Sequence, residues 1–294
     1  MDRFQGVYPA IITPFKNDEL NLDALERFLN VLKDRNINGI VVNGTTGEAP
    51  LLDSNERIEL IKKCREVLGA NMILIAGTGA LSTREAIKFS NDAYNAGADV
   101  LLITPPYYFK YGVNAQIEYY KDISKSIQIP IILYNIPQMI GYYIDLTTID
   151  KLVDGEKFIG VKDSSGDLQY HLDVIDLIKD RGIVFCGFDT LIPYSLLNGA
   201  KGIIAASGNL IPDKLSKIYK LILNGELKKA MTIYRRVYDI LRACTMFGVV
   251  AVKKLLNKAG FNVGEPRKPL DIGYRDPNID RYMDMIDLSI LDIR

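Results

Sequence analysis

The residue with the clearest chemical potential is Lys162, which ends the apolar run of residues 158–162 (FIGVK). Such a run predicts a buried strand, so its terminal amine should lie where water is scarce. Desolvation disfavours the ammonium form and favours the neutral amine, which can attack a carbonyl carbon and form a Schiff base. The alternative is a structural ion pair between Lys162 and a carboxylate such as that of Asp163. This run alone favours the ion pair, and the rest of the chain reverses that balance.

Few other residue types could support a different kind of catalysis. The chain has one histidine, His171, in the amphipathic stretch 167–180, which predicts that it faces solvent on a helix. A zinc-dependent aldolase needs several imidazoles around its metal, and a Ser-His or Cys-His pair needs a positioned base. We therefore expect no metal and no cofactor. Lysine, tyrosine, threonine or carboxylate side chains must carry any catalysis.

The composition narrows the class of partner. Lys+Arg and Asp+Glu number 36 each in 294 residues, so no net charge attracts nucleic acid or an anionic membrane. No window approaches a membrane span, and residues 1–5 lack the apolar core of a signal peptide. Cys64, Cys186 and Cys244 match no metal or redox spacing and fit a reducing compartment. We expect a cytoplasmic protein whose partner is a small molecule.

A repeated pattern predicts the elements that must position Lys162. Eight short apolar segments, each followed by an amphipathic helical pattern, cover residues 7–13, 39–43, 72–77, 100–104, 130–134, 158–162, 183–187 and 202–206. They are continuously rich in Val, Ile and Leu, as parallel strands buried on both faces are. The pattern predicts an α/β fold, specifically a (β/α)8 TIM barrel. The rival is an open doubly wound sheet, but no Gly-x-Gly-x-x-Gly follows the first segment to bind a dinucleotide.

After Pro212 the strand pattern ends and helical patterns remain. They cover residues 214–223, 227–241, 249–259 and 277–290, with an extended connection at 266–270. We expect two domains, a barrel that carries the active site over residues 1–224 and a C-terminal helical extension over residues 225–294.

In barrels of this kind the reactive groups collect at the C-terminal ends of the strands. The predicted strand ends carry hydroxyls, phenols and glycines around a single lysine. Residues 44–48 (GTTGE) follow the second strand, and their glycines, backbone N–H groups and threonine hydroxyls could bind a carboxylate. The spacing of Thr45 and Glu48 also fits a helix capping box, and the two interpretations can hold together.

Two further strand ends carry candidate groups. Tyr134 ends the fifth strand beside Lys162 on the sixth, where a phenol could move protons to and from a substrate oxygen. The alternative is a structural aromatic residue at the barrel rim, and the same applies to Tyr107 and Tyr108. Asp189, after the seventh strand, is either a ligand for substrate hydroxyls or a cap for the next helix.

Together these motifs resemble the dihydrodipicolinate synthase / N-acetylneuraminate lyase superfamily of class I pyruvate-dependent aldolases. The three signatures are GTTGE at 44–48, YNIP at 134–137 and GVKD at 160–163, in the family's order, and the resemblance covers the whole chain. It implies cofactor-independent Schiff-base chemistry with pyruvate or another 2-oxo acid. It also implies a barrel with a C-terminal helical domain, commonly in a homotetramer built as a dimer of dimers.

The resemblance assigns roles by position. Lys162 would form the Schiff base, and Tyr134 would be the general acid and base. Thr45 and Thr46 would hold the pyruvate carboxylate, with Thr46 also linking the proton relay that Tyr108 completes in a neighbouring subunit. The pocket for the variable end of the substrate would be lined by Ser164, Gly187, Asp189, Ala206 and Ser207.

Departures from the family's pattern bear on the substrate. Dihydrodipicolinate synthases usually carry an arginine where this chain has Met139, and that arginine binds the second carboxylate of their aldehyde substrate. N-acetylneuraminate lyases usually show Asp-Glu where this chain has Asp189 and Thr190. The pattern resembles archaeal-type 2-keto-3-deoxygluconate aldolases best, and no added positive charge favours a phosphorylated substrate.

We therefore expect a lyase that reversibly cleaves a 2-keto-3-deoxy sugar acid, 2-keto-3-deoxygluconate above all, to pyruvate and an aldehyde such as glyceraldehyde. The alternatives within the superfamily are an N-acetylneuraminate lyase-like enzyme, a dihydrodipicolinate synthase-like enzyme and a sugar-acid dehydratase. The alternative of a different class is a non-catalytic metabolite-binding barrel, which would not need the complete set of Lys162, Tyr134 and the two threonines.

Overall fold

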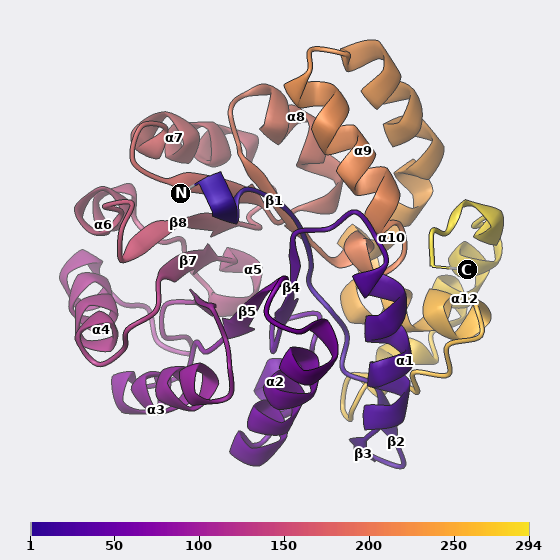
Figure 1. Ribbon diagram of the computed structural model, residues 1–294, viewed down its shortest axis with the longest axis horizontal. Helices are drawn as coiled ribbons and strands as arrows, with labels where there is room; N and C mark the ends of the chain where they lie inside the picture. Colours follow the sequence, from indigo (N-terminus) through magenta and orange to yellow (C-terminus); the bar gives the residue numbers. More distant parts are fainter. Residues whose placement is uncertain (1, 294) are drawn as a thin grey trace.

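Eight parallel strands form the centre of the molecule and helices surround them (Figure 1), in a computed structural model that describes residues 2–293. The barrel strands are β1 (Gly6–Pro9), β4 (Gly39–Val42), β5 (Ile73–Gly77), β6 (Val100–Ile103), β7 (Ile131–Asn135), β8 (Phe158–Asp163), β9 (Ile183–Cys186) and β10 (Gly202–Ala205). Each overlaps one of the eight predicted segments.

The strands close into a barrel. Their order is β1-β10-β9-β8-β7-β6-β5-β4, all in parallel. The two ends of this sheet meet at a bridge between Ala10 and Val41, where the N–H of Ile11 donates to the Val41 carbonyl at 2.9 Å. The predicted (β/α)8 barrel is therefore confirmed, and the open doubly wound alternative is wrong.

The strands are apolar on both faces because each face has its own core. One buried cluster lies inside the barrel and includes Ile132 and Tyr134 of β7, while a larger cluster between strands and helices includes Ile131 and Leu133 of the same strand. Side chains alternate between the faces of a strand. This alternation directs Tyr134 into the barrel.

The helices around the barrel follow the predicted amphipathic stretches. They are α1 (Leu22–Lys33), α2 (Ser54–Leu68), α3 (Thr83–Asn95), α4 (Val113–Lys125), α6 (Leu146–Leu152), α7 (Leu168–Ile178), α8 (Ile192–Leu197) and α9 (Pro212–Leu223). The capping box at the start of α2 is formed by Asp53 and Glu56. The alternative box of Thr45 and Glu48 is therefore wrong, because the Glu48 side chain makes no cap hydrogen bond and pairs elsewhere.

Short elements connect the barrel strands to their helices and cover the ends of the barrel. They are the hairpin of β2 (Phe15–Lys16) and β3 (Glu19–Leu20), the helix α5 (Pro137–Ile140), and the 3-10 turns η1 (Asp2–Phe4), η2 (Ala49–Leu51), η3 (Asp189–Leu191) and η4 (Ala206–Asn209). Among them η1 brings Phe4 into the cluster inside the barrel.

The C-terminal part is helical and packs beside α1 and α9, on the right in Figure 1. It consists of α10 (Leu227–Lys258), α11 (Asp271–Tyr274), α12 (Pro277–Asp284) and η5 (Leu288–Ile290). The predicted helices 227–241 and 249–259 are two parts of α10, which is kinked at Gly248 (φ 52°, ψ −133°). The predicted helix 277–290 is shorter than expected, because a 3-10 turn replaces its last part. The two-domain division at residue 224 stays a prediction, since α10 shares one apolar core with the barrel helices.

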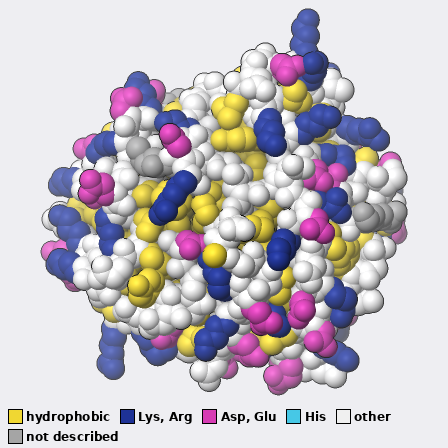
Figure 2. Space-filling model, viewed as in Figure 1, with side chains coloured by type: hydrophobic (Ala, Val, Ile, Leu, Met, Phe, Trp, Pro, Cys, Tyr) yellow, Lys and Arg dark blue, Asp and Glu magenta, His cyan; other side chains and the backbone are white. Residues whose placement is uncertain are grey.

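Lysine, arginine, aspartate and glutamate side chains intermingle on the face seen in Figure 2, so neither sign dominates it. No helix among residues 2–293 combines the length and apolar character that crossing a membrane would require.

Candidate active site

Lys162 and Tyr134 lie side by side on neighbouring strands. They are register partners across the β7–β8 pair, and the Nζ atom of Lys162 lies 4.0 Å from the centre of the Tyr134 ring. Lys162 is only 4% exposed. No carboxylate of the described residues forms an ion pair with it. The amine is therefore buried at the C-terminal end of a strand, as the sequence predicts for a nucleophile.

Asp163 does not pair with Lys162, because its carboxylate is engaged on the other side of β8. Its Oδ1 accepts from the side-chain amide of Asn135 at 2.7 Å, and its Oδ2 accepts from the Ser165 hydroxyl at 3.0 Å. Asn135 is the register partner of Asp163, so this contact joins the two strands that carry Tyr134 and Lys162. The structural ion pair between Lys162 and Asp163 is thus wrong.

The prediction that His171 faces solvent is also wrong. Its side chain is buried, with Nδ1 2.8 Å from Asp163 Oδ2 and Nε2 2.7 Å from Ser195 Oγ. A carboxylate oxygen can only accept, so Nδ1 donates to Asp163, and the Ser195 hydroxyl is the hydrogen-bond partner of Nε2. The inward position follows from the need to satisfy the buried carboxylate. Ser195 lines none of the cavities near Lys162, so the arrangement supports structure and is not a serine nucleophile site.

The loop of residues 44–48 brings a threonine hydroxyl to Tyr134. Thr45 Oγ1 lies 3.3 Å from the Tyr134 hydroxyl, and either oxygen can donate. Thr45 is therefore the threonine that contacts Tyr134, and Thr45 and Thr46 both line the cavity beside Lys162. The link in the proton relay that the resemblance assigns to Thr46 stays a prediction. A role of either threonine in holding a carboxylate stays a prediction.

A cavity of about 220 Å³ opens beside the amine of Lys162. It is lined by Thr45, Thr46, Tyr134, Ile136, Gln138, Met139, Lys162, Ser164, Gly187, Phe188, Asp189, Ile204, Ala206, Cys244, Thr245 and Gly248. Eight of the ten residues predicted for the site thus line one cavity. Of the other two, Ser207 adjoins the cavity, because it follows Ala206 and its backbone N–H donates to Asp189, and Tyr108 lies outside it.

Gly187 is required by the crowding around the amine. A Cβ atom at this position would lie 2.1 Å from Ser164 Oγ and 2.7 Å from Lys162 Cε. Real Cβ contacts are essentially never shorter than 3.0 Å. Any side chain at residue 187 would therefore displace either the lysine or the serine hydroxyl.

Asp189 faces the cavity and does not cap a helix. It begins η3, and its Oδ1 accepts from the backbone N–H of Ser207 at 2.8 Å. Burial raises the pKa of the Asp189 carboxyl, and hydrogen bonds from Ser207 and the charge of Lys162 oppose that rise. A buried carboxylate with accepting capacity left can bind substrate hydroxyls. The helix-cap alternative for Asp189 is wrong.

Two hydroxyls of the lining lack partners. The hydroxyl oxygens of Ser164 and Thr245 are buried and make no hydrogen bond to any described residue. Buried polar groups are normally satisfied, so unsatisfied ones in a cavity mark places where a ligand can donate or accept. Thr245 and Cys244 come from α10, just before its kink at Gly248, and Gly248 lines the same cavity. The sequence analysis missed both, and the glycine inside the helical pattern was the available signal.

A second cavity of about 300 Å³ adjoins the first, since Thr45, Tyr134, Ile136 and Met139 line both. It contains Tyr107 and the buried guanidinium of Arg57. That guanidinium donates to the carbonyls of Ala49 and Leu52, and burial lowers its pKa. Sequence reasoning missed Arg57, which lies inside an otherwise ordinary helical pattern.

Tyr108 does not reach the cavity of its own chain. It is 85% exposed, has a backbone φ of 79°, and stacks edge-on with Phe109. An exposed aromatic pair is compatible with an intersubunit contact. The role of Tyr108 in a neighbouring subunit stays a prediction, as does the homotetramer.

The structure offers no ready metal position among residues 2–293, where no three His, Cys, Asp or Glu side chains are grouped as ligands.

Comparisons with known proteins agree with the fold and the motifs. The model of the dihydrodipicolinate synthetase family matches residues 3–274. A 4-hydroxy-tetrahydrodipicolinate synthase of Methanocaldococcus jannaschii is 36% identical over 272 residues, 91% of this chain and 92% of that one. An uncharacterized DapA-like lyase of Pyrobaculum neutrophilum is 34% identical over 280 residues, 91% of this chain and 93% of that one. Among solved structures, the 4-hydroxy-tetrahydrodipicolinate synthase of Methylacidiphilum fumariolicum SolV superposes with a TM-score of 0.91 at 32% identity, covering 96% of this chain and 94% of that one.

Proposed function

Because this chain belongs to the dihydrodipicolinate synthetase family and is a lyase of the aldolase type, we propose that it cleaves a 2-keto-3-deoxy sugar acid. The products would be pyruvate and an aldehyde, and 2-keto-3-deoxygluconate would be the preferred substrate, with glyceraldehyde released. The observation that carries the choice of substrate is the lining of the cavity beside Lys162, which combines unpartnered hydroxyls and a carboxylate with no second cation.

The arrangement of Lys162 and Tyr134 supports the following sequence of steps. The Lys162 amine attacks the C2 carbonyl, and loss of water gives a protonated imine that accepts electrons. Tyr134, oriented by the Thr45 hydroxyl at 3.3 Å, takes the proton from the C4 hydroxyl. The C3–C4 bond breaks and the aldehyde leaves. The electron pair of the broken bond passes to the protonated imine, which becomes an enamine. Protonation at C3 and hydrolysis by water release pyruvate and restore the amine.

The lining of the cavity fits a hydroxylated chain better than a second carboxylate. Lys162 is the only cationic side chain among the residues that line it, and Met139 stands at the position of the family's arginine. A thioether cannot replace the paired, charge-assisted hydrogen bonds of a guanidinium. Asp189, Ser164 and Thr245 can exchange hydrogen bonds with the hydroxyls of a sugar acid.

The second candidate is a dihydrodipicolinate synthase-like reaction, and the names of several relatives favour it. The aldehyde in that reaction carries a carboxylate. The arginine to consider for that carboxylate is Arg57, which lines the adjoining cavity and not the cavity beside Lys162. Its guanidinium already donates to the backbone carbonyls of Ala49 and Leu52. The N-acetylneuraminate lyase-like, dehydratase and non-catalytic alternatives have no observation of their own in this structure.

The test compares two reactions of one preparation. We expect kcat/KM for cleavage of 2-keto-3-deoxygluconate to exceed that for formation of 4-hydroxy-tetrahydrodipicolinate from pyruvate and a carboxylate-bearing aldehyde. The difference should be at least about 10- to 100-fold, the value of one missing charge-assisted hydrogen bond. The variant Met139→Arg should narrow the difference, while Met139→Leu serves as the matched control. A faster synthase reaction in the unsubstituted protein would overturn the proposed substrate and favour the second candidate.

The remaining expectations belong to the same proposal. They are a cytoplasmic location, a role in carbohydrate metabolism, a homotetramer, and completion of the proton relay by Tyr108 of another subunit. The exposure of Tyr108 and Phe109 supports the last two. Size-exclusion chromatography with light scattering tests the assembly, and a monomer would remove the role of Tyr108.

A further inference from the structure

A fully buried ion pair joins the C-terminal helices to the loop that carries Thr45. The Nζ atom of Lys253, in α10, lies 2.6 Å from Oε1 of Glu48, and both side chains are 0% exposed. Glu48 is the last residue of the 44–48 loop, and about two hundred residues of chain separate it from Lys253. Neither residue has such a role in the sequence-based predictions above.

Both members of the pair have further partners. Oε2 of Glu48 accepts from the backbone N–H of Arg267 at 2.7 Å. Nζ of Lys253 donates to the Glu265 carbonyl at 3.1 Å and lies 4.3 Å from the centre of the Phe15 ring. Burial lowers the pKa of Lys253 to about 8, the charge of Glu48 opposes this, and the charge of Arg267 adds to it. A charge pair removed from water in this way depends on each partner remaining in place.

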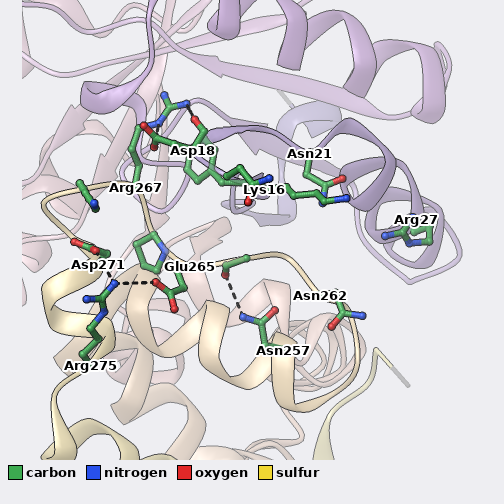
Figure 3. A pocket seen from close by; sticks show the side chains of 15 residues that line it. Lys16, Asp18, Asn21, Arg27, Asn257, Asn262, Glu265, Arg267, Asp271 and Arg275 are labelled. Atoms are coloured by element: carbon green, nitrogen blue, oxygen red, sulfur yellow. Dashed lines mark hydrogen bonds and ion pairs between the residues drawn. The ribbon is translucent and has the colours of Figure 1, made fainter.

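The side chain of Arg267 makes further contacts with the residues around the 44–48 loop. Its guanidinium binds the Glu56 carboxylate at 2.6 and 2.8 Å, the Leu51 carbonyl at 2.9 Å and Asp18 Oδ1 at 3.1 Å. Figure 3 shows Arg267, on the C-terminal segment, reaching Asp18 of the β2–β3 hairpin across the rim of an open groove. The C-terminal segment therefore contacts the last residue of the 44–48 loop, Glu48, and the residues Leu51 and Glu56 that follow it.

The loop needs such support because of its backbone conformation. Glu48 has φ 58° and ψ 29°, the left-handed region that residues with a side chain rarely adopt. Its N–H donates to the Thr45 carbonyl at 3.0 Å, which closes a turn, and the Thr13 hydroxyl donates to the Gly47 carbonyl at 2.7 Å. The turn that Glu48 closes thus contains Thr45, whose hydroxyl contacts Tyr134.

We propose that Lys253 is a positioning residue for the reaction, which holds Glu48, and through it the Thr45 hydroxyl, in contact with Tyr134. The inference rests on the proposed Schiff-base function but not on the identity of the aldehyde. It gives the C-terminal helical segment a role in proton transfer, in addition to the residues of α10 that line the cavity beside Lys162. Lys253 acts only through Glu48 and lines neither cavity near Lys162.

Two measurements with pyruvate alone separate the steps. Borohydride trapping reports imine formation at Lys162. Exchange of the pyruvate methyl protons with solvent deuterium, followed by NMR, reports proton transfer by Tyr134 after the imine has formed. Both are measured at saturating pyruvate on the full-length protein, and each variant is shown to be folded by its thermal unfolding curve.

The test variant is Lys253→Met, which keeps the aliphatic stem and removes the charge. The matched control is Lys254→Met, the next residue of α10, whose amine pairs with Asp280 at 2.7 Å and lies over the Tyr274 ring rather than binding Glu48. We expect Lys253→Met to slow deuterium exchange at least 10-fold while borohydride still labels Lys162 to completion. Lys254→Met should leave both measurements within twofold of the unsubstituted protein.

A double variant covers the case in which Lys253→Met leaves Glu48 unpaired and fails to fold. Glu48→Gln combined with Lys253→Met removes both charges, and the same loss of exchange is expected. An exchange rate within twofold of the unsubstituted protein, in either folded variant, would overturn the inference. An equal loss of deuterium exchange in Lys254→Met would overturn the inference too, because the effect would then come from a general disturbance of α10 and not from the Lys253–Glu48 pair. Absence of any label in the unsubstituted protein would instead overturn the proposed function, and the inference with it.

Discussion

Replacing His171 with alanine should destabilise the protein strongly, although the residue lines no cavity of the site. The imidazole is 1% exposed and connects the Asp163 carboxylate, at 2.8 Å, to the Ser195 hydroxyl, at 2.7 Å. Alanine would remove one partner of a buried carboxylate and leave the Ser195 hydroxyl without this partner. It would also leave a cavity where the ring had been.

The magnitude follows from these losses. A hydrogen bond to a charged group contributes about 1.5–3 kcal/mol, and a buried hydroxyl left unsatisfied costs about 1–3 kcal/mol. We therefore expect the free energy of unfolding to fall by about 3–6 kcal/mol for His171→Ala. Proteins are typically stable by only about 5–15 kcal/mol. The variant should be close to the limit of stable folding, whereas the sequence pattern of a solvent-facing histidine would predict a change of less than about 0.5 kcal/mol.

The assay is urea unfolding at pH 7 and fixed protein concentration, followed by circular dichroism and by tyrosine fluorescence to check that the transitions coincide. The matched control is Gln169→Ala on the same helix, because the Gln169 side chain is exposed and, among residues 2–293, donates only to Asp173. The control should change stability by less than about 0.5 kcal/mol. A loss below about 1 kcal/mol for His171→Ala would refute the reasoning that this network supports the ends of β7 and β8.

Three other outcomes follow from the structure. Gly187→Ala should lower kcat/KM at least 100-fold in a folded protein, because the new Cβ would lie 2.1 Å from Ser164 Oγ; near-normal kinetics would contradict the crowding argument. Thr45→Val should slow proton transfer at Tyr134 at least 10-fold without preventing borohydride labelling, and unchanged deuterium exchange would argue against a link between the two hydroxyls. Burial raises the pKa of Tyr8 and of Tyr120 above the ordinary value near 10, so the folded state keeps protons that the unfolded state loses. The stability that these residues contribute is complete below pH 10. It falls as the pH rises further, by up to about 1.4 kcal/mol per residue and pH unit. Denaturant unfolding at pH 9, 10 and 11 measures this fall, and a free energy of unfolding that stays constant over this range would contradict it.

The barrel could be predicted because its signals are local and repeated. Each strand is a short apolar run and each helix an amphipathic stretch, so eight repeats specify the fold without knowledge of any long-range contact. Strand ends then specify the position of the site, which is why Lys162 and Tyr134 are found together as expected.

Long-range polar contacts could not be predicted in the same way. His171 lies in an amphipathic pattern, and nothing local shows that the carboxylate of Asp163 needs it as a partner. The same holds for Glu48, whose spacing from Thr45 imitates a capping box while its carboxylate binds Lys253 from the far end of the chain. Thr245 was missed because its place in the cavity depends on the kink of α10. His171 and Glu48 are buried polar groups whose partners no local pattern identifies, and Thr245 is a hydroxyl whose position depends on how α10 packs.

The central claim is that Lys162 forms a Schiff base with a 2-oxo acid. The most direct measurement is intact-protein mass spectrometry after incubation with pyruvate and borohydride, followed by peptide mapping. The account predicts one pyruvate-derived adduct per chain, located on Lys162 and absent from Lys162→Ala. A folded protein that acquires no adduct, or acquires it on another lysine, would contradict the account and favour a barrel that binds metabolites without catalysis.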